Sequence, residues 1–473
     1  MTARLDPDDL ATCLRVLAAA GELDSDHPDS VTVQRAVGHM FKRLKRSRRA
    51  AARNAVSAAD SAVIAATATG SPDRIDDETN GIPLSSTATG ASAGTLIRPR
   101  PCYICKKRYT HVDAFYHQLC PDCAAMSHAK RDARTDLAGR RALLTGGRAK
   151  IGMYIALRLL RDGAETTITT RFPHDAARRF ASMPDSNDWL HRLHIVGIDL
   201  RDPAQVVALA DSVAAQGPLD VLINNAAQTV RRPPDSYAAL VAAENAPLPI
   251  GMPAAITTFG KTMQRHPALA STLPDSVAAH VSELALVAGS AAPQRISAGI
   301  AIDAGGLVPD LADTNSWVQT VGAVDPVELL EVQLCNSVAP FILVSRLRPA
   351  LAAAAANRKY VVNVSAMEGQ FGRGYKGPGH PHTNMAKAAL NMLTRTSAAE
   401  MFDTDRILMT AVDTGWITDE RPHPTKIRLA EEGFHAPLDL VDGAARVYDP
   451  IVQGESGVDL YGCFLKDYQP SAW

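Results

Sequence analysis

Apolar side chains near the start of the chain recur at helical spacing. They lie three and four residues apart from Leu10 to Leu17, stop at Gly21, and recur in the same way from Val33 to Leu44. This spacing places them on one face of a helix, and a glycine after the last apolar residue is typical of a helix end. The pattern predicts a helical N-terminal segment over residues 1–65.

Periodicity is lost over residues 66–98, where threonine, serine, glycine, alanine and aspartate dominate. Such a composition is typical of a flexible linker, which we predict for this range.

From residue 137 the pattern changes again, and short apolar runs alternate with amphipathic helical segments. The runs predicted as strands are 141–144, 165–170, 194–198, 219–223, 360–364 and 458–465. Strands that alternate with helices form a parallel sheet covered by helices on both faces. We predict an α/β fold over residues 137–473: a Rossmann-like, doubly wound parallel sheet.

Composition excludes several classes of protein. Of the 473 residues, 46% are hydrophobic and 21% are charged, and 49 basic residues balance 50 acidic ones to a net charge of -1. This composition is ordinary for a globular chain and excludes wholesale disorder. The near-zero net charge excludes a positive potential over the whole chain that would attract polyanions. No apolar run reaches about 18 residues, and Asp6, Asp8 and Asp9 stand where a secretory signal would be apolar. We expect a cytoplasmic protein with no membrane contact.

Positive charge is nevertheless concentrated locally. Residues 42–53 hold seven lysines and arginines and no acidic residue. Such a run can contact nucleic acid or an acidic protein, here together with the cysteine-rich segment that follows the linker. The alternative, a solvated helix face, is favoured by the lack of interleaved aromatic residues that could stack on bases.

Residues 99–130 contain two Cys-x2-Cys pairs separated by fourteen residues, formed by Cys102, Cys105, Cys120 and Cys123. Two pairs at this spacing can supply the four thiolates of a tetrahedral structural zinc site, with His117 nearby as an alternative ligand. A segment of about thirty residues cannot bury enough surface to fold alone, so the metal would contribute the folding free energy. We predict a small module with a structural Zn2+.

A glycine-rich turn follows the first strand of the α/β region. Thr145 to Gly152 reads TGGRAKIG and leads directly into a helix. Glycines let the backbone approach a pyrophosphate, and the amide groups of the helix N-terminus attract the anion. The order of strand, glycine turn and helix predicts a dinucleotide site.

Three motifs in this order resemble the short-chain dehydrogenase/reductase family. Its TGxxxGxG turn is similar to TGGRAKIG, its acidic-apolar pair to Asp199-Leu200, and its NNAG turn to the NNAA of residues 224–227. The resemblance covers residues 137–227 and 326–473 and leaves 228–325 as an insertion. Within the turn, Lys150 stands where the family has its middle glycine.

The resemblance implies a bound NADP or NAD. Cationic side chains in the turn and at the end of the second strand favour the 2′-phosphate of NADP, although the strand-end arginine could also be merely solvated. The positions that match the cofactor motifs are Thr145, Gly146, Arg148, Lys150, Ile151, Gly152, Arg171, Asp199, Leu200, Asn225, Ala226, Lys387, Gly415 and Thr418.

The family's catalytic residues are an Asn, a Ser and a Tyr-x-x-x-Lys pair, and this chain matches only part of the set. Asn336 and Lys387 occupy the Asn and Lys positions, but Thr383 replaces the tyrosine. A threonine hydroxyl has no accessible alkoxide near neutral pH, whereas a lysine-assisted phenol does. The family's serine falls on Ala366, and Ser365 lies one residue earlier, where an extended strand would point it the other way.

A substitute acid or base could come from the glycine-rich loop 367–381. Tyr375 is the candidate we predict, with His382 as another, while an exposed loop aromatic is the equal alternative for Tyr375.

Two functions fit these residues. The first is an NAD(P)-dependent oxidoreductase, with NADP favoured, that transfers hydride between the nicotinamide and a carbonyl or alcohol of a small-molecule substrate through an altered Ser/Tyr/Lys relay. The second is a catalytically inactive dinucleotide-binding scaffold or sensor whose zinc module and basic helix bind a partner. The insertion 228–325 fits a lid or specificity element as well as a surface for homo-oligomer contact.

Overall fold

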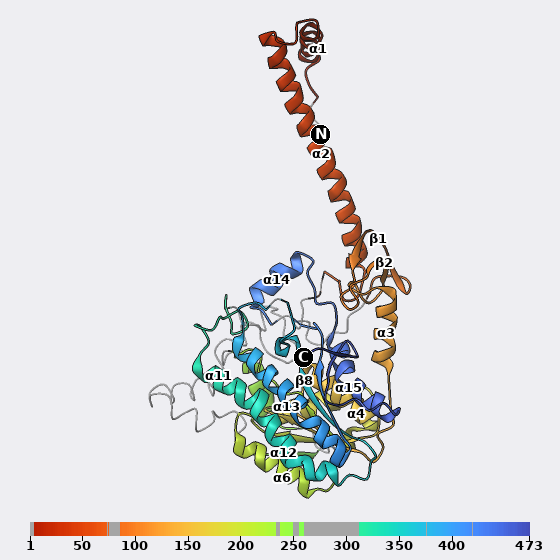
Figure 1. Ribbon diagram of the computed structural model, residues 1–473, viewed down its shortest axis with the longest axis vertical. Coiled ribbons are helices and arrows are strands. Elements are labelled where there is room, and N and C mark those ends of the chain that lie inside the picture. The colour runs from red at the N-terminus through yellow and green to blue at the C-terminus, as the bar shows by residue number, and fades with distance from the viewer. Residues whose placement is uncertain are drawn as a thin grey trace.

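The computed structural model describes residues 4–72, 74, 86–232, 237–248, 255–259, 312–374, 376–418 and 420–473. These form a helical arm, a small cysteine module at the base of the arm, and a large α/β body (Figure 1). The chain passes through these parts in that order.

The body is built on a sheet that has nine strands among the described residues, in the order β11-β10-β9-β8-β6-β3-β4-β5-β7. All pairings are parallel except that of β10 with β11. The predicted Rossmann-like fold class is therefore confirmed. The strands are β3 (Arg141–Leu144), β4 (Glu165–Thr170), β5 (Leu193–Gly197), β6 (Val221–Asn224), β7 (Ala255–Thr258), β8 (Lys359–Ser365), β9 (Ile407–Asp413), β10 (Phe464–Lys466) and β11 (Gln469–Ser471).

Two apolar cores lie on opposite faces of this sheet. Leu144 belongs to the core formed with α4 (Lys150–Arg161), α5 (Pro173–Ala181) and α15 (Leu440–Glu455). Its neighbour Leu143 belongs to the other core, because successive residues of a strand point to opposite faces. The helices of that second core are α6 (Pro203–Ala215), α12 (Ala339–Ala352) and α13 (Pro381–Asp405).

The helical stretch Pro326–Ala352 has the length and apolar composition of a membrane span, and 56% of its most apolar window is buried inside the body. It comprises α11 (Pro326–Gln333), the π-helical turn η4 (Leu334–Val338) and α12. Buried core helices meet the same criteria, which accounts for this stretch.

The described part of the insertion is integrated into the body. Strand β7 pairs with β5 and extends the sheet by one strand. Helix α7 (Ala238–Asn245) packs on α5, where the carboxylate of Glu244 accepts hydrogen bonds from the backbone N–H groups of His174 and Asp175 at 3.0 and 3.1 Å. Glu244 thereby satisfies donors in the first turn of α5 that no helical carbonyl can reach.

The cysteine module consists of β1 (Ser92–Pro101), β2 (Arg108–Asp113) and α3 (Pro121–Asp132). The prediction of a flexible linker over residues 66–98 is wrong at both described ends. Strand β1 begins at Ser92, and Thr67 to Gly70 are buried beside the module, with the N–H of Thr69 donating to the carbonyl of Phe115 at 2.8 Å. Small polar residues are equally suited to linkers and to tight, hydrogen-bonded turns, so composition could not separate the two.

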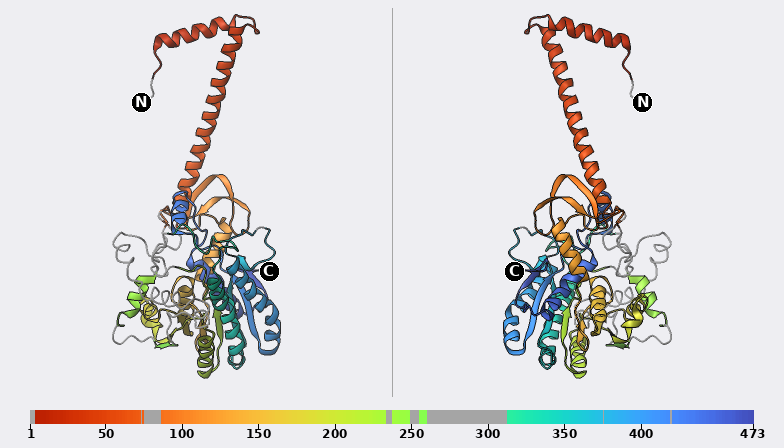
Figure 2. Two further views of the ribbon diagram at one scale, coloured as in Figure 1. Left: turned by 90° about the vertical axis from the view of Figure 1, so that its left-hand side faces the viewer. Right: turned by 90° about the vertical axis from the view of Figure 1, so that its right-hand side faces the viewer.

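The arm consists of α1 (Pro7–Gly21) and the long helix α2 (Pro28–Ala65). Helix α2 projects from the module, and α1 folds across its far end (Figure 2). At the base, the carboxylate of Asp60 accepts hydrogen bonds from the N–H groups of Ile97 and Arg98 at 2.6 and 3.2 Å. These bonds attach the arm to the module.

Helix α3 of the module is docked on the start of α15 through buried charges. Arg131 lies 2.5 Å from Asp439 and 3.2 Å from Asp442, and the Tyr116 hydroxyl donates to Asp442 at 2.6 Å. The side chain of Asp442 is 0% exposed, so Arg131 compensates a charge that water cannot reach.

We predict that Arg131→Met destabilises the protein by about 3 kcal/mol, because it leaves two neighbouring carboxylates buried without their cation. Denaturant unfolding measures the change. The control is Arg395→Met on an exposed position of α13, which should stay within about 0.5 kcal/mol of the unsubstituted protein. Equal stability of the two variants would contradict the assigned role.

Candidate cofactor and active site

The backbone of the glycine turn between β3 and α4 is packed so tightly that Gly146 and Gly152 leave no room for a side chain. A Cβ on Gly152 would lie 1.9 Å from the carbonyl oxygen of Gly146, and one on Gly146 would lie 2.9 Å from the Cα of Ala226. Helix α4 starts after Ala149, which provides no side-chain cap. The first N–H groups of α4 are thus available to an anion, as the pyrophosphate of a dinucleotide requires.

Lys150 adopts the backbone conformation that explains why the family places a glycine there. Its φ is 53°, in the left-handed region that glycine adopts without strain. Its Nζ lies 3.9 Å from the carboxylate of Glu420. The lysine therefore keeps the shape of the turn and adds a positive charge beside it.

Thr145, Asn225 and Ala226, predicted to bind cofactor, hold the turn in shape. The Thr145 hydroxyl accepts hydrogen bonds from the N–H groups of Asn225 and Ala226, both at 3.0 Å. The Asn225 amide donates to the carbonyls of Thr145 and Gly146 at 3.0 and 3.1 Å. These contacts join the ends of β3 and β6 and hold the backbone of the turn in position.

Two arginines gather at the carboxyl end of β4. Arg148 lies 2.5 Å from Asp175, and its guanidinium is 5.5 Å from the ring centre of Phe172. Arg171 lies over Phe172 at 5.7 Å and over Tyr237 at 5.2 Å. Tyr237 comes from the insertion and was not identified from the sequence. The two guanidiniums form a cationic, aromatic-lined corner where the family places the adenosine ribose.

Asp199 and Leu200 follow β5 on the same edge of the sheet. The carboxylate of Asp199 is bound by the side chain of Arg201, with the closest contact at 2.6 Å, and Leu200 is buried. Arg201 also contacts Glu331 of α11 at 2.9 Å. The structure thus places Asp199 in an ion-pair network, a partner set that the sequence did not indicate.

Asn336 lies in the π-helical turn η4, and such turns are frequent at functional sites. Its side-chain amide pairs in both directions with the backbone of Gln228, at 2.7 and 2.9 Å. Asn336 therefore secures the first residue of the insertion, at the end of the loop after β6.

Lys387 projects from α13 to the end of β8, where its ammonium donates to the carbonyl of Val364 at 2.7 Å. Burial lowers the pKa of Lys387 to about 8, although the nearby acidic groups of Glu368 and Cys335 oppose the shift. The predicted lysine thus lies at the carboxyl edge of the sheet with a partly buried charge.

The other predicted catalytic side chains that the structure describes are buried. Ser365 is 2% exposed, and its hydroxyl donates to the side chain of Asn391 at 2.6 Å. The Thr383 hydroxyl donates to the carbonyl of His380 at 2.9 Å. His382 is buried, with its Nε2 3.9 Å from Glu328. Tyr375 lies outside the described residues.

Glu368 is a residue that the sequence reasoning missed. It lies in the short helix η5 (Met367–Gly369) directly after β8 and is partly exposed. Burial is the main influence on the pKa values of Lys387, Asp413 and His380, and the charge of Glu368 raises all three. The sequence signal that could have identified Glu368 is its place just after β8, the strand whose end lacks the family's serine.

The segment after β9 contains Gly415 and Thr418. Gly415 has a φ of 76°, and its N–H donates to Asp413 at 2.9 Å, while the Thr418 hydroxyl donates to Glu420 at 3.3 Å. The N–H of Trp416 donates to the hydroxyl of Tyr103 at 2.9 Å. Tyr103 belongs to the cysteine module, so the module contacts the segment where the family binds the nicotinamide.

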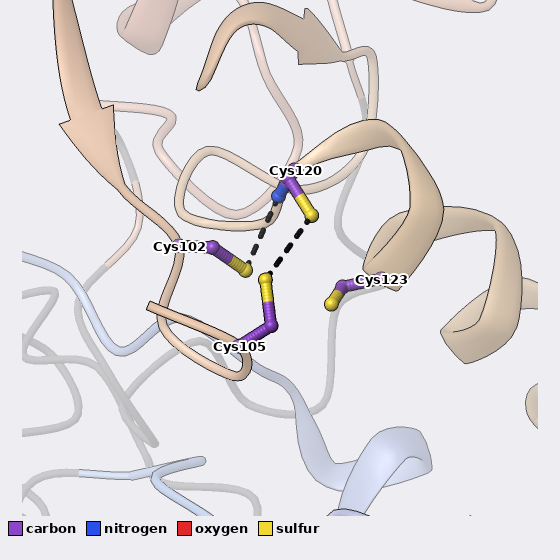
Figure 3. Close-up of side chains that lie close together, drawn as sticks. All are labelled: Cys102, Cys105, Cys120 and Cys123. Atoms are coloured by element: carbon purple, nitrogen blue, oxygen red, sulfur yellow. Dashed lines mark hydrogen bonds between the residues drawn. The ribbon is translucent and has the colours of Figure 1, made fainter. Parts of the chain in front are cut away.

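The four cysteines of the module converge on one point (Figure 3), and their sulfur atoms all lie within 4.8 Å of one another. Sulfur atoms at tetrahedral positions 2.3 Å from a zinc ion are about 3.8 Å apart, so the cluster fits a four-thiolate site. His117, the alternative ligand, is instead buried against Thr69, with 2.8 Å between its Nδ1 and the Thr69 hydroxyl oxygen. The four thiolates would hold the metal and leave no open position for chemistry.

Comparison with known proteins agrees with this architecture. The family model for short chain dehydrogenase matches residues 140–241. An uncharacterised protein of Acanthamoeba polyphaga mimivirus is 30% identical over 74% of this chain and 71% of its own length.

A probable oxidoreductase of Streptomyces lividans is 40% identical, but the match spans 19% of this chain and 29% of the relative. Among solved structures, an NADPH-bound carbonyl reductase from chicken fatty liver is 19% identical, with a TM-score of 0.43, over 71% of this chain and 100% of the reductase. From its glycine turn, its parallel sheet and the matching family model, the chain belongs to the short-chain dehydrogenase/reductase family.

Proposed function

We propose that this protein is an oxidoreductase that uses NADP to transfer hydride to or from a carbonyl or alcohol carbon. The observation that carries the proposal is the tightly packed glycine turn before the uncapped helix α4, on the same sheet edge as Lys387. The turn supplies a phosphate site and Lys387 a cation for the nicotinamide ribose. When bound, the nicotinamide would supply the hydride chemistry.

The preference for NADP rests on charge at the end of β4. Arg171 lies beside the stacked rings of Phe172 and Tyr237, and Arg148 lies beside the same phenylalanine. A 2′-phosphate brings about two negative charges that these guanidiniums can bind, whereas an unmodified ribose has none. Asp175 pairs with Arg148 and offsets its charge. Arg171 therefore provides the main electrostatic preference for NADP over NAD.

We predict that Arg171→Ser weakens NADPH binding about tenfold, the effect of losing one charge-assisted hydrogen bond, and leaves NADH binding within about twofold. Fluorescence titration of both cofactors measures the selectivity. Arg346→Ser, on the far side of the body where Arg346 pairs with Asp211, is the matched control. Equal loss for both cofactors would contradict a role in recognising the 2′-phosphate.

For the cysteine module we propose a structural zinc ion held by Cys102, Cys105, Cys120 and Cys123. The module shares an apolar core with the body through Ile417 and Leu438, and Tyr103 hydrogen-bonds the segment after β9. Metal binding would thus order residues that support the nicotinamide end of the site. The site requires reduced thiols, which supports our proposal of a cytoplasmic location.

We predict one zinc ion per chain in the unsubstituted protein and in Cys13→Ser, and less than half of that in Cys105→Ser. Cys13 and Cys105 are both exposed, so the two variants differ in the cluster and not in burial. Metal analysis after dialysis measures the content. The Cys105→Ser variant should also melt at a lower temperature, because metal binding contributes folding free energy. Full zinc content in Cys105→Ser would refute the four-thiolate site.

A second proposed function, binding to a polyanionic partner, is favoured by the exposure of the arm. All seven basic side chains between residues 42 and 53 are exposed on α2, which stands clear of the body (Figure 2). The arm could therefore reach a nucleic acid without blocking the cofactor site.

If the arm binds nucleic acid, the full-length protein should bind a labelled DNA duplex with an affinity that falls steeply as salt increases, because phosphate contacts release counterions. Replacing Arg46, Arg48 and Arg49 by glutamine should weaken binding at least about tenfold at low salt. Anisotropy titrations at several salt concentrations measure this. Absence of binding at low salt would exclude nucleic acid and leave an acidic protein.

A further inference from the structure

Among the described residues, the positions at which the family carries out proton transfer hold no free hydroxyl. Thr383 and Ser365 both donate to protein acceptors, and Ala366 has no polar side chain. If hydride transfer occurs here, another group must exchange a proton with the substrate oxygen.

The backbone fixes Glu368 beside the turn of α13 that carries Lys387. A Cβ on the next residue, Gly369, would lie 2.8 Å from the backbone carbonyl of Lys387, and the carbonyl of Gly369 accepts a hydrogen bond from Asn391 at 3.1 Å. Lys376 donates to the carbonyls of Met367 and Glu368. These contacts hold the main chain, and among the described residues no hydrogen bond or ion pair engages the Glu368 carboxylate.

The charge of Glu368 acts on groups from three different elements. Burial lowers the pKa of Lys387 in α13 and of His380 in the preceding loop, and the charge of Glu368 opposes both shifts. Burial raises the pKa of Asp413 in β9, and the charge of Glu368 raises it further. Glu368 lies on the short turn after β8, which packs against the part of α13 that carries Lys387, at the carboxyl edge of the sheet. Because Glu368 is also partly exposed, it can exchange a proton with water.

The neighbouring candidates are already engaged. Asp413 is 4% exposed and accepts from the N–H of Gly415 at 2.9 Å. His380 stacks on Trp317 with 3.9 Å between ring centres, and its Nδ1 lies 2.8 Å from the Trp317 carbonyl oxygen. Glu368 is the acid or base of this group that remains free.

We propose that Glu368 is the catalytic acid/base that takes the place of the family's tyrosine, with Lys387 as its neighbouring cation; this inference rests on the proposed oxidoreductase function. In alcohol oxidation, the hydroxyl proton passes to a carboxylate oxygen of Glu368. The carbon loses a hydride, with both electrons of its C–H bond, to the nicotinamide of NADP+, and a C=O bond forms. The protonated carboxyl then releases its proton to water, and carbonyl reduction reverses these steps.

The test uses the full-length Glu368→Gln variant, which keeps the shape of the side chain and removes its charge. The control is Glu165→Gln, at an exposed position at the opposite, amino-terminal end of β4. The first measurement is binding of NADP+ and NADPH. A carboxylate beside the nicotinamide favours its cationic, oxidised form, so Glu368→Gln should weaken NADP+ binding about threefold or more and leave NADPH binding unchanged.

The second measurement is turnover of a panel of alcohols and carbonyl compounds. We expect kcat to fall about 100-fold in Glu368→Gln and to stay unchanged in Glu165→Gln. Turnover of Glu368→Gln within about threefold of the unsubstituted protein, or an unchanged ratio of NADP+ to NADPH affinity, overturns the role of Glu368. Absence of turnover in the unsubstituted protein overturns the oxidoreductase proposal instead, and the binding ratio then decides whether Glu368 lies at the nicotinamide.

Discussion

The parallel direction of the central strands is the constraint on which the rest of the structure depends. Because parallel strands all end at the same edge of the sheet, the segments after β3, β4, β6, β8 and β9 meet there. The glycine turn, Arg171 after β4, Glu368 and the Gly415 segment are distant in sequence and meet at one edge of the sheet for this reason. Lys387 reaches the same edge from α13, where it contacts the end of β8.

The cysteine module adds a second layer to this edge. Arg131 and Tyr116 dock it on the first turn of α15, and Tyr103 extends from it to the N–H of Trp416. The module is therefore part of the environment of the proposed active site, and its folding and that of the body are linked by a shared apolar core. In contrast, residues 4–59 of the arm make no such contact with the described part of the body, and the basic residues of the arm are exposed.

Motifs whose chemistry depends on local spacing could be predicted from the sequence. Cys102 and Cys123 are recognisable because each belongs to a Cys-x2-Cys pair, and the turn around Gly152 because only glycine fits a backbone packed against a carbonyl. The side chains of the catalytic relay were harder to predict from the sequence. A strand reverses its side-chain direction at every residue, and the hydrogen bond from Ser365 to Asn391 follows from that register and not from residue type.

The sequence by itself determined the α/β class, the dinucleotide turn, the position of Lys387 and the cysteine cluster, because periodicity, glycine and paired thiols act over a few neighbouring residues. Only the tertiary structure decided that Tyr103 supports the segment after β9, that Tyr237 of the insertion lies near Arg171, and that the turn with Glu368 packs against α13 at Lys387. These contacts join residues far apart in the chain. No local pattern records them, because they arise when separate strands end at one edge.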